Sequence, residues 1–498
     1  MFSDNTISLA EASTGIGKSR VINQIAKEQT DKGNQVVVAS PTLQVLSQLI
    51  KEWKDIHQTS INFVIGKGQF VSLQKVEEWI KDENIQEVDP KIEDQILQDK
   101  QNVLEWIKNG GKNTCEATKI FHDHHKDLAW LAEDMEAIAP TAPVNSLLLN
   151  GDKNREEKDI AELVHENLIN KSQIEKNKPV FTTHSALVWD QKLQKMNSKN
   201  ILPLDSTHLI IDEAHLFSSI VESAHSTSLS LRGLLFALKK NTAIWKQAKK
   251  TTKAKEAIRE VQKMLNVLKN FKHIEKFNLN NEDLNPDIKQ EIVNSGLNLL
   301  KKLKPLENVN STINNAIDAL YGMTQETFGT HIEYSPKRKY PSITTGPRSL
   351  KSFFENFWSK WTTAALISAT IYIPLKEGRL SSSMIRVPLH LFDVAELPPV
   401  YANWVYDPEM KIITKNENIV PPQESKYKNK SREEFEQDIQ TWFNLVAEKI
   451  KEIKKQAKGG ILILLPGYEY IYNIAERLTD LDCLIAQKHG GYKLAKNK

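Results

Sequence analysis

A short glycine-containing segment near the start constrains this chain more than any other feature. Residues 12–19 read Ala-Ser-Thr-Gly-Ile-Gly-Lys-Ser, which has the spacing of a phosphate loop with Ala in place of the usual first Gly. Residues 6–10 alternate polar and apolar as a strand does, and residues 20–27 have helical periodicity. Glycines let successive backbone N–H groups turn towards phosphate oxygens, and the helix N-terminus adds partial positive charge. The segment therefore predicts a nucleotide-phosphate site.

The phosphate loop supplies the first candidate binding residues. Lys18 is expected to reach the β- and γ-phosphates of a nucleotide, and Ser19 is expected to bind Mg²⁺. The predicted cofactors are therefore ATP and Mg²⁺. The residues expected to surround the phosphates are Ser13, Thr14, Gly15, Ile16, Gly17, Lys18 and Ser19.

Three further apolar runs predict buried parallel strands that end in polar residues. They are residues 35–44, which contain Ser-Pro-Thr42, residues 207–217, which contain Asp-Glu-Ala-His, and residues 364–370, which end in Ser-Ala-Thr. A carboxylate at a strand end beside a phosphate loop can hold Mg²⁺ through water, and Asp212 fits that role. Glu213 is placed to orient or deprotonate the attacking water, and His215 completes the catalytic set with Lys18. The pattern predicts an α/β fold with a parallel sheet.

Composition narrows the class of protein. The 498 residues predict two to four domains, and 40% apolar with 26% charged residues is ordinary for a globular chain. No run approaches 18 consecutive apolar residues and no secretory leader is present, so a cytoplasmic location without a membrane partner is expected. The two cysteines, Cys115 and Cys483, cannot form a disulfide framework or a four-cysteine metal site.

The order of these motifs resembles that of superfamily 2 helicases, and three details resemble the DinG and XPD group among them. Glu11–Lys18 has that group's wording of the phosphate loop. Val180–Leu187 is similar to the strand that precedes the Asp-Glu-Ala-His box, with Thr183 where Asn is usual. The long interval between Asp212 and Ser368 leaves room for the group's helical arch insertion.

The resemblance implies a RecA-like motor lobe in an ATP hydrolase that acts as a 5′→3′ helicase on single-stranded DNA. It implies that Thr42 and His184 touch the DNA strand from this lobe. It also implies that Ser368 and Thr370 couple the nucleotide to the second ligand. Two other classes remain open: a truncated or inactive motor that binds ATP and DNA as a scaffold or regulator, and a phosphate-loop ATPase unrelated to nucleic acid.

One departure from the group concerns an insert at about residues 68–178. Most members open an iron–sulfur domain with a segment similar to Gly66–Ser72, in which a cysteine lies near the position of Ser72. Clusters need about four thiolates, and Cys115 is the one cysteine that follows in this region, so no iron–sulfur cluster is expected. The chain resembles the cluster-lacking DinG helicases of type IV CRISPR systems, which implies an RNA-guided complex as partner. A metal site at Cys115 with 122–125 (His-Asp-His-His) is the weaker interpretation, and exposed polar residues on a helix the favoured one.

A second departure concerns both ends of the motor. Ten residues precede Glu11, where the group usually has a Gln that reads adenine. A strand at 459–465 and a helix from Tyr468 resemble the start of a second lobe, but the group's later Glu-Gly and Gly-Arg motifs are absent. That lobe normally supplies an arginine finger, which contributes about 10³–10⁵ in rate. The chain is therefore expected to bind ATP and hydrolyse it slowly.

The predicted organisation has four parts: a first lobe at 1–216 with the insert, a mainly helical arch at 217–345, a return strand at 346–372 and a partial second lobe at 373–498. The arch is expected to contain helices at 231–240, 254–271 and 288–303 and to end in a turn-rich segment at 340–348. The basic run at residues 231–277 either meets a phosphate backbone or is a solvated helix face. Trp245, Phe271 and Phe277 either stack on bases or anchor the core.

Overall fold

The computed structural model describes most of the chain. By its contacts the chain divides into two compact units: the first comprises residues 1–77 and 147–401, and the second comprises residues 78–146 and 402–498. Among the described helices, none combines the length and the apolar character that crossing a membrane requires. The described residues are 6–13, 15–81, 90–112, 115–139, 142, 144–149, 159–171, 175, 177–195, 202, 207–240, 245–246, 249–271, 276–281, 284–307, 311–334, 341–375, 379–400, 432–456, 461–465, 468–478, 481, 484–486 and 492–494.

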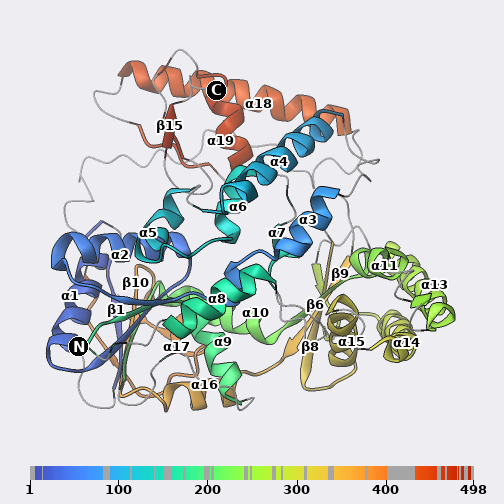
Figure 1. The fold of residues 1–498 in the computed structure, drawn as a ribbon, viewed down its shortest axis with the longest axis horizontal. Helices are drawn as coiled ribbons and strands as arrows, with labels where there is room; N and C mark the ends of the chain where they lie inside the picture. Colours follow the sequence, from blue (N-terminus) through green and yellow to red (C-terminus); the bar gives the residue numbers. More distant parts are fainter. Residues whose placement is uncertain are drawn as a thin grey trace. The chain divides into compact units, whose positions relative to one another are not determined.

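The first unit contains a seven-stranded sheet in which every neighbouring pair is parallel (Figure 1). This confirms the prediction of an α/β fold with a parallel sheet. The strands follow the apolar runs of the sequence because a parallel strand is buried on both faces. Their spatial order is β13 (Val394–Glu396), β1 (Ile7–Glu11), β10 (Thr363–Ser368), β5 (Thr207–Asp212), β2 (Gln35–Ser40), β4 (Val180–Thr183) and β3 (Asn62–Val64).

Helices cover both faces of this sheet. On one face, Val37, Leu209 and Leu366 pack with buried residues of α9 (His184–Lys195), α10 (Phe217–His225) and α16 (Lys351–Trp358). Successive side chains of a strand point to opposite faces, so Val38 and Ile210 face the other side. That side is covered by α1 (Lys18–Asp31) and α2 (Leu43–His57), which contact the same strands.

The segment expected to be a helical arch contains helices and a second sheet. The helices are α11 (Leu231–Lys240), α13 (Thr251–Lys269), α14 (Pro286–Leu303) and α15 (Ser311–Met323). The sheet is antiparallel, in the order β6 (Thr227–Ser230), β9 (Pro341–Pro347), β8 (Phe328–Tyr334) and β7 (Lys276–Asn278). The prediction that 340–348 is turn-rich was therefore wrong for 341–347. Ile343 and Thr345 alternate inward along this strand, although Pro and Gly lie at its ends.

The aromatic residues of the arch belong to its core. Trp245 is 1% exposed, and its indole N–H donates to the backbone oxygen of Leu238 at 2.8 Å. Phe271 and Phe277 have ring centroids 5.9 Å apart and pack against the same buried cluster. These contacts favour the core interpretation over base stacking, since Trp245 presents no exposed face to a ligand.

Part of the insert belongs to the first unit and is organised around one buried carboxylate. Asp159 is 8% exposed and lies between α3 (Leu73–Lys81) and α8 (Ile160–Lys171). Its oxygens accept hydrogen bonds from the Ser72 hydroxyl at 2.7 Å and from backbone N–H groups of both helices. Ser72, which occupies the expected cysteine position, is thus bound to a carboxylate. Two helix N-termini gain the acceptor that their unpaired N–H groups need.

Residues after β10 return to the first sheet. They pass through β11 (Ile373–Pro374), β12 (Leu380–Ser381) and α17 (Ser383–Arg386), and β13 then pairs in parallel with β1. From the sequence, this stretch was expected to begin a partial second lobe. The apolar run of the three-residue strand β13 is too short to indicate a strand. Its partner, β1, lies near the other end of the sequence.

The second unit is described by its helices and one antiparallel strand pair. Its elements are α4 (Pro90–Lys108), α5 (Glu116–His124), α6 (Ala132–Ile138), α18 (Arg432–Gln456), α19 (Tyr468–Ala475), β14 (Leu484–Ala486) and β15 (Tyr492–Leu494). The helix expected from Tyr468 is present. The strand expected at 459–465 is not formed at 461–465, the part that is described. Ile463 and Leu465 pack on the α18–α19 cluster, while Leu462 and Leu464 are more than four-fifths exposed.

Candidate active site

The carboxyl ends of three neighbouring strands bring the predicted site residues together. In the sheet, β1 lies beside β10 and β10 beside β5, with Glu11 opposite Ser368 and Ile367 opposite Asp212. The phosphate loop follows β1, Glu213 follows β5, and Thr370 follows β10. Ligands of open α/β sheets bind at this edge, just beyond the carboxyl ends of the strands.

The phosphate loop has the backbone conformation for which its glycines were expected. Gly15 has φ 84° and Gly17 has φ 87°, in the left-handed region that side chains disfavour. A Cβ added at either position would meet no atom within 4 Å, so conformation and not space requires glycine. Gly17 caps the N-terminus of α1. Ile16 lies between them, and Thr14 lies outside the described residues.

Lys18 lies between two acidic side chains. Its ammonium group donates to Glu213 and lies 3.4 Å from Oδ1 of Asp212, and 11% of its side chain is exposed. An ammonium held by two carboxylates in a poorly solvated place is stabilised there. A nucleotide phosphate entering the loop would compete with Glu213 for this cation.

Asp212 has the features expected of a residue that holds a cation. It is buried, and burial raises the pKa of its carboxyl, against the opposing effect of the Lys18 charge. Its Oδ1 is inaccessible to solvent and makes no hydrogen bond, but it faces the Lys18 ammonium as an ion pair at 3.4 Å. A buried acceptor needs a donor or a cation, which Lys18 supplies here. Ser19, the second residue of α1, is partly buried and offers a hydroxyl, so the two fit Mg²⁺, which prefers oxygen ligands, waters and phosphates.

Glu213, His215 and Ser368 form a hydrogen-bonded network. Oγ of Ser368 lies 2.7 Å from Nδ1 of His215 and 3.3 Å from Oε2 of Glu213, and it accepts from the backbone N–H of Thr370. A hydroxyl has one proton and two lone pairs. If it donates to Glu213 and accepts from Thr370, its second lone pair takes the proton of His215 Nδ1. The neutral His215 ring then carries its lone pair on Nε2.

The backbone of Glu213 is itself unusual. It has φ 50° and ψ 49°, in the left-handed region that few residues other than glycine adopt. The turn carries the chain from the end of β5 into the short helix at Ala214–Leu216 and directs Glu213 towards Lys18. Backbone conformations of this kind cost free energy and persist where the surroundings enforce them.

The two residues expected to touch DNA differ in their surroundings. Thr42 is exposed, and its hydroxyl accepts from the N–H of Val45 as the N-cap of α2. His184 is fully buried with its ring against Phe217, at 5.3 Å between centroids. Burial lowers the pKa of His184 to about 3, so the ring is neutral. The β4–α9 junction encloses this ring, and its contact with a DNA strand stays a prediction.

Among the coupling residues, Ser368 is buried in the network while Thr370 is exposed. Ser13, expected to face phosphate, donates both its N–H and its hydroxyl to the backbone oxygen of Val400. Glu11 is a functional candidate to which the sequence motifs assigned no role. The carboxylate of Glu11, just before the loop, accepts two backbone hydrogen bonds from the segment after Thr370. The sequence feature that could have identified Glu11 is an acidic residue at the end of an apolar strand, directly before the phosphate loop.

The histidines near Cys115 do not form a metal centre in the described part of the chain. His122 is buried, and its two ring nitrogens lie 3.0 Å from the backbone oxygen of Leu128 and 2.8 Å from Oδ2 of Asp134. Asp134 also accepts from Thr118. The favoured expectation of exposed polar residues was therefore wrong for His122. It is a structural residue with polar partners inside the second unit.

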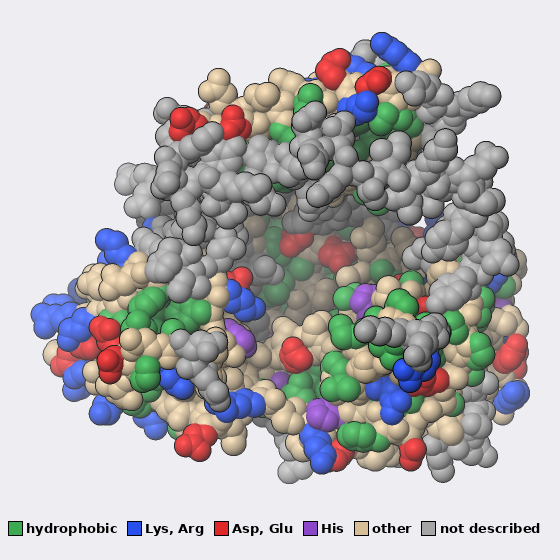
Figure 2. All heavy atoms as spheres, turned by 180° about the vertical axis from the view of Figure 1, so that it is seen from behind, with side chains coloured by type: hydrophobic (Ala, Val, Ile, Leu, Met, Phe, Trp, Pro, Cys, Tyr) green, Lys and Arg blue, Asp and Glu red, His purple; other side chains and the backbone are tan. Residues whose placement is uncertain are grey.

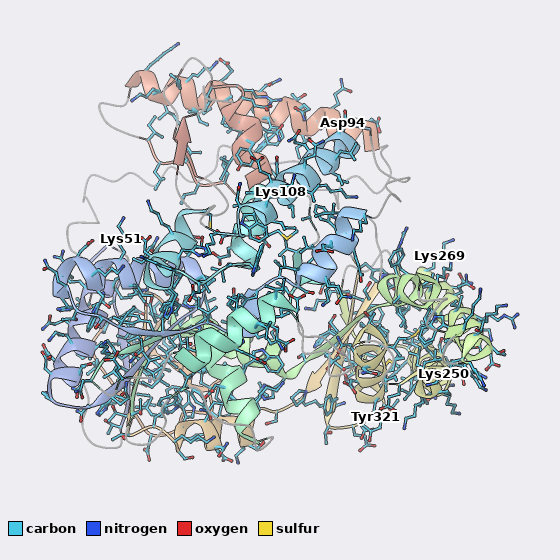
Figure 3. All side chains as sticks on the ribbon, in the orientation of Figure 1. Lys51, Asp94, Lys108, Lys250, Lys269 and Tyr321 are labelled. Atoms are coloured by element: carbon cyan, nitrogen blue, oxygen red, sulfur yellow. The ribbon has the colours of Figure 1, made fainter. Side chains whose placement is uncertain are left out.

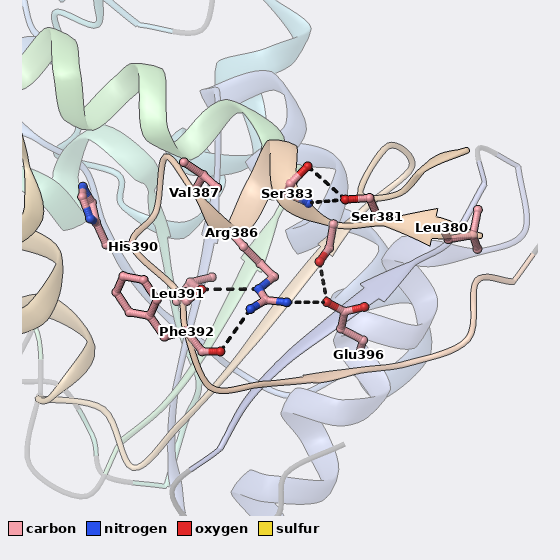
Figure 4. A pocket seen from close by; sticks show the side chains of 10 residues that line it. Leu380, Ser381, Ser383, Arg386, Val387, His390, Leu391, Phe392 and Glu396 are labelled. Carbon is pink, nitrogen blue, oxygen red and sulfur yellow. Dashed lines mark hydrogen bonds and ion pairs between the residues drawn. The ribbon is translucent and has the colours of Figure 1, made fainter. Parts of the chain in front are cut away.

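A separate cavity of about 510 Å³ is lined by residues 380–396 of the first unit (Figure 4). Arg386 donates to Glu396 at 3.1 Å and to the backbone oxygens of Leu391 and Phe392, and Ser382 also donates to Glu396. The charges in this cavity are thus paired with one another. None of its lining residues belongs to the phosphate loop or to the network at Glu213, so the strand ends are the better candidate site.

No family model matches the chain, and no curated protein matches it. Solved structures to which the chain is similar include "Structure of S. tokodaii Xpd4", 11% identical with a TM-score of 0.45, covering 95% of this chain and 70% of that one. "XPD_Helicase" is 15% identical with a TM-score of 0.43, covering 95% and 71%. "Truncated XPD" is 15% identical with a TM-score of 0.38, covering 79% and 96%. At these values the likeness assigns no residue a role.

Proposed function

We propose that this chain is an ATP-dependent motor that acts on single-stranded DNA as a helicase or translocase, 5′→3′ by its resemblance to the DinG and XPD group. One observation carries the proposal. A phosphate loop, a buried carboxylate paired with the loop lysine and an acidic residue bonded to the same lysine meet at the ends of neighbouring parallel strands. This is the arrangement that phosphoryl transfer by positioning and electrostatics requires.

The phosphate loop and Lys18 would bind the nucleotide. Backbone N–H groups around Gly15 and Gly17 would face the phosphates, and Lys18 would exchange Glu213 for the β- and γ-phosphates. Ser19 and Asp212 would hold Mg²⁺, which neutralises charge on the phosphate oxygens when it is bound. Release of Glu213 from Lys18 would leave its carboxylate available to a water molecule.

Glu213 would then orient the attacking water and accept its proton. The Ser368 hydroxyl lies against Oε2 of Glu213 and would fix the direction of the carboxylate. His215, bonded to the same hydroxyl, would hold Ser368 in that orientation. A base placed in this way contributes typically about 10²–10⁴ in rate.

The basic face of the arch is the proposed site for the phosphate backbone of DNA. Lys253, Lys255 and Arg259 are exposed on α13, whose ends are marked by Lys250 and Lys269 (Figure 3). Figure 2 shows Lys and Arg side chains gathered over this part of the first unit, with fewer acids between them. The exposed Thr42 is a second proposed contact. Clustered cations supply sequence-independent affinity for nucleic acid.

We further propose that target choice is delegated to an RNA-guided complex, as the resemblance to cluster-lacking DinG helicases of type IV CRISPR systems implies. At the expected cysteine position, Ser72 donates to Asp159, which also accepts from α3 and α8. These contacts support the proposal that no iron–sulfur cluster is bound there. Such a complex would open a duplex and this chain would load on the displaced strand. Pull-down from cells that encode both should recover the complex, and its absence would count against this part.

A second candidate is a motor that binds ATP and DNA as a scaffold or regulator without efficient turnover. One observation favours it. Within the described residues of the second unit, the strands form a single antiparallel pair and no parallel sheet. A parallel sheet like that of the first unit would be needed to present an arginine to the γ-phosphate from a second lobe.

ATP hydrolysis with and without single-stranded DNA separates the candidates. The wild-type chain is compared with Lys18→Ala and Glu213→Gln, and Glu222→Gln on the exposed face of α10 serves as the matched control. A motor shows DNA-stimulated turnover that both site variants lose, by about 10² or more for Glu213→Gln. ATP and DNA binding without turnover identifies the scaffold. Absence of salt-dependent DNA binding contradicts both and leaves an ATPase unrelated to nucleic acid.

A further inference from the structure

Glu11 directly precedes the phosphate loop, but its carboxylate binds a different segment of the backbone. Oε2 accepts hydrogen bonds from the N–H groups of Ile371 and Tyr372, each at 2.6 Å. The residue is 5% exposed. A buried carboxylate of this kind makes short, directional bonds that are about twice as strong as neutral ones.

The segment that Glu11 holds is the turn that follows β10. The N–H of Thr370 donates to Oγ of Ser368 at 3.3 Å, which fixes the start of the turn. Ile371 is 1% exposed within the core, and the Tyr372 hydroxyl donates to the backbone oxygen of Leu397 at 2.8 Å. Glu11 therefore restrains the end of a turn whose beginning is restrained by Ser368.

Backbone bonds join the same three segments. The N–H of Ala12 donates to the oxygen of Ser368 at 2.9 Å, and the N–H of Val400 donates to the oxygen of Glu11 at 2.9 Å. The first residues of the phosphate loop thus lie against the end of β10 on one side and against residue 400 on the other. The carboxylate of Glu11 adds two side-chain hydrogen bonds between the loop entrance and the turn after Ser368.

We infer that Glu11 is a positioning residue that sets the Ser368 hydroxyl relative to the phosphate loop. The inference rests on the proposed function, because Ser368 matters through its bonds to Glu213 and His215. A shift of residues 370–372 would change the direction of the Ser368 hydroxyl and with it the orientation of the Glu213 carboxylate. Glu11 touches neither nucleotide nor water in this scheme and acts through Ser368.

The substitutions Glu11→Gln and Glu11→Ala differ in whether an acceptor remains for the two N–H groups. Both donors point at a single oxygen, so the amide oxygen of Glu11→Gln can accept them, whereas Glu11→Ala leaves two N–H groups without their acceptor. Glu11→Ala is expected to lower kcat per bound nucleotide by about tenfold to a hundredfold, as loss of bonds to a charged acceptor implies. The KM for ATP changes much less because Lys18 and the loop remain attached to β1 and α1. Glu11→Gln recovers most of the loss.

The experiment measures three quantities on the full chain: ATP turnover with single-stranded DNA, the stoichiometry of a bound non-hydrolysable ATP analogue, and amide hydrogen exchange at residues 369–372. Asp159→Ala and Asp159→Asn are matched controls, because Asp159 is a buried carboxylate that also accepts backbone N–H groups, all outside the phosphate loop. Of these four variants, Glu11→Ala alone should strongly lower kcat per bound nucleotide and accelerate exchange at 371–372.

The outcomes separate this inference from the proposed function. If the wild-type chain turns over ATP and Glu11→Ala does so equally per bound nucleotide, the inference is overturned and the function stands. If the chain binds nucleotide without turnover, the inference still requires the analogue to slow exchange at 371–372 in the wild type and not in Glu11→Ala. If the chain binds no nucleotide, both are overturned.

Discussion

Single residues show how this chain places charge where water is scarce. Lys18 is shared by two carboxylates and Glu11 by two backbone N–H groups. Asp159 accepts from the Ser72 hydroxyl and from three backbone N–H groups of two helices. In each case a buried ionised group is matched by partners of opposite polarity, as its desolvation demands. Asp212 differs in that its Oδ1 makes no hydrogen bond and is met by the Lys18 charge at 3.4 Å. In the proposed function, this carboxylate would hold Mg²⁺ once Lys18 binds phosphate.

At the residue scale, His165 is expected to make the free energy of unfolding depend on pH. Its ring is buried against Phe70, with Nε2 at 3.2 Å from the oxygen of Ile65, and burial lowers its pKa to about 4. The folded pKa lies below the unfolded value, so stability is full above about pH 6.5 and falls as the pH drops towards 4. Between pH 7 and pH 5 this group should remove about 2 kcal/mol of unfolding free energy.

Denaturant unfolding at several pH values measures the effect. His165→Gln keeps an N–H donor for Ile65 but does not titrate, so its stability should fall less steeply between pH 7 and pH 5 than that of the wild type. His331→Gln, at an exposed position on β8, is the control and should leave the slope unchanged. Equal slopes for wild type and His165→Gln would show that folding does not lower the pKa of this histidine.

At the scale of elements, two adjacent glycines in the second unit allow the cost of backbone strain to be measured apart from the cost of steric overlap. Gly110 and Gly111 have φ 80° and 64° after the end of α4. A Cβ at Gly110 would meet no atom within 4 Å, whereas one at Gly111 would overlap the ring of Trp130. The Trp130 ring packs edge-on against Trp106, and the backbone N–H of Trp130 donates to the backbone oxygen of Gly111. The ring therefore has little room to move away.

Gly110→Ala should cost roughly 1–2 kcal/mol of unfolding free energy for the left-handed backbone alone. Gly111→Ala should cost that amount plus about 1–3 kcal/mol for the overlap. Urea unfolding followed by tryptophan fluorescence reports on both, since Trp106 and Trp130 lie at this site. Equal costs for the two variants would mean that the ring shifts freely.

The elements that could be predicted are those whose pattern is local. The strands β1, β2, β5 and β10 follow from apolar runs that end in polar residues, and α11, α13 and α14 follow from helical spacing. The strand β9 was missed because Pro341, Gly346 and Pro347 resemble a turn, while its pairing with β6 depends on residues more than a hundred positions away. The helix α9 could be anticipated only as part of a motif, so the burial of its first residue, His184, was not foreseen.

The candidate site divides in the same way. Asp212, Glu213 and Ser368 lie at neighbouring strand ends beside the phosphate loop of Lys18, as the motif spacing indicates, because parallel strands align their carboxyl ends. The hydrogen bonds among them depend on side-chain directions that spacing does not determine. The bond between Glu11 and residues 371–372 joins positions that only the completed sheet brings together. Roles for these residues stay predictions until the substitutions are measured.

At the scale of the molecule, the described surface predicts how DNA affinity depends on salt. Each cation that neutralises a phosphate of a single strand contributes about −0.7 to the slope of log K against log salt. Replacing Lys253 and Lys255 by Gln should therefore reduce the magnitude of the slope by about 1.4. Fluorescence anisotropy with a labelled oligonucleotide at several salt concentrations measures it.

The matched control removes two charges elsewhere. Lys51→Gln combined with Lys455→Gln affects exposed residues on α2 and α18 and should leave the slope unchanged. If the control and the α13 variant change the slope equally, the attraction is a property of the overall charge. If neither changes it, DNA binds through another surface.

The position of β1 has a consequence for biosynthesis. Both neighbours of this strand, β10 and β13, come from beyond residue 360, although β1 itself begins at residue 7. On the ribosome, at about 5–20 residues per second, the strand that leads into the phosphate loop must wait roughly 20–80 seconds for a partner. During that time its apolar residues depend on chaperones or transient collapse for protection. Nascent chains arrested before residue 360 should therefore be degraded or aggregate, however well the arch has folded.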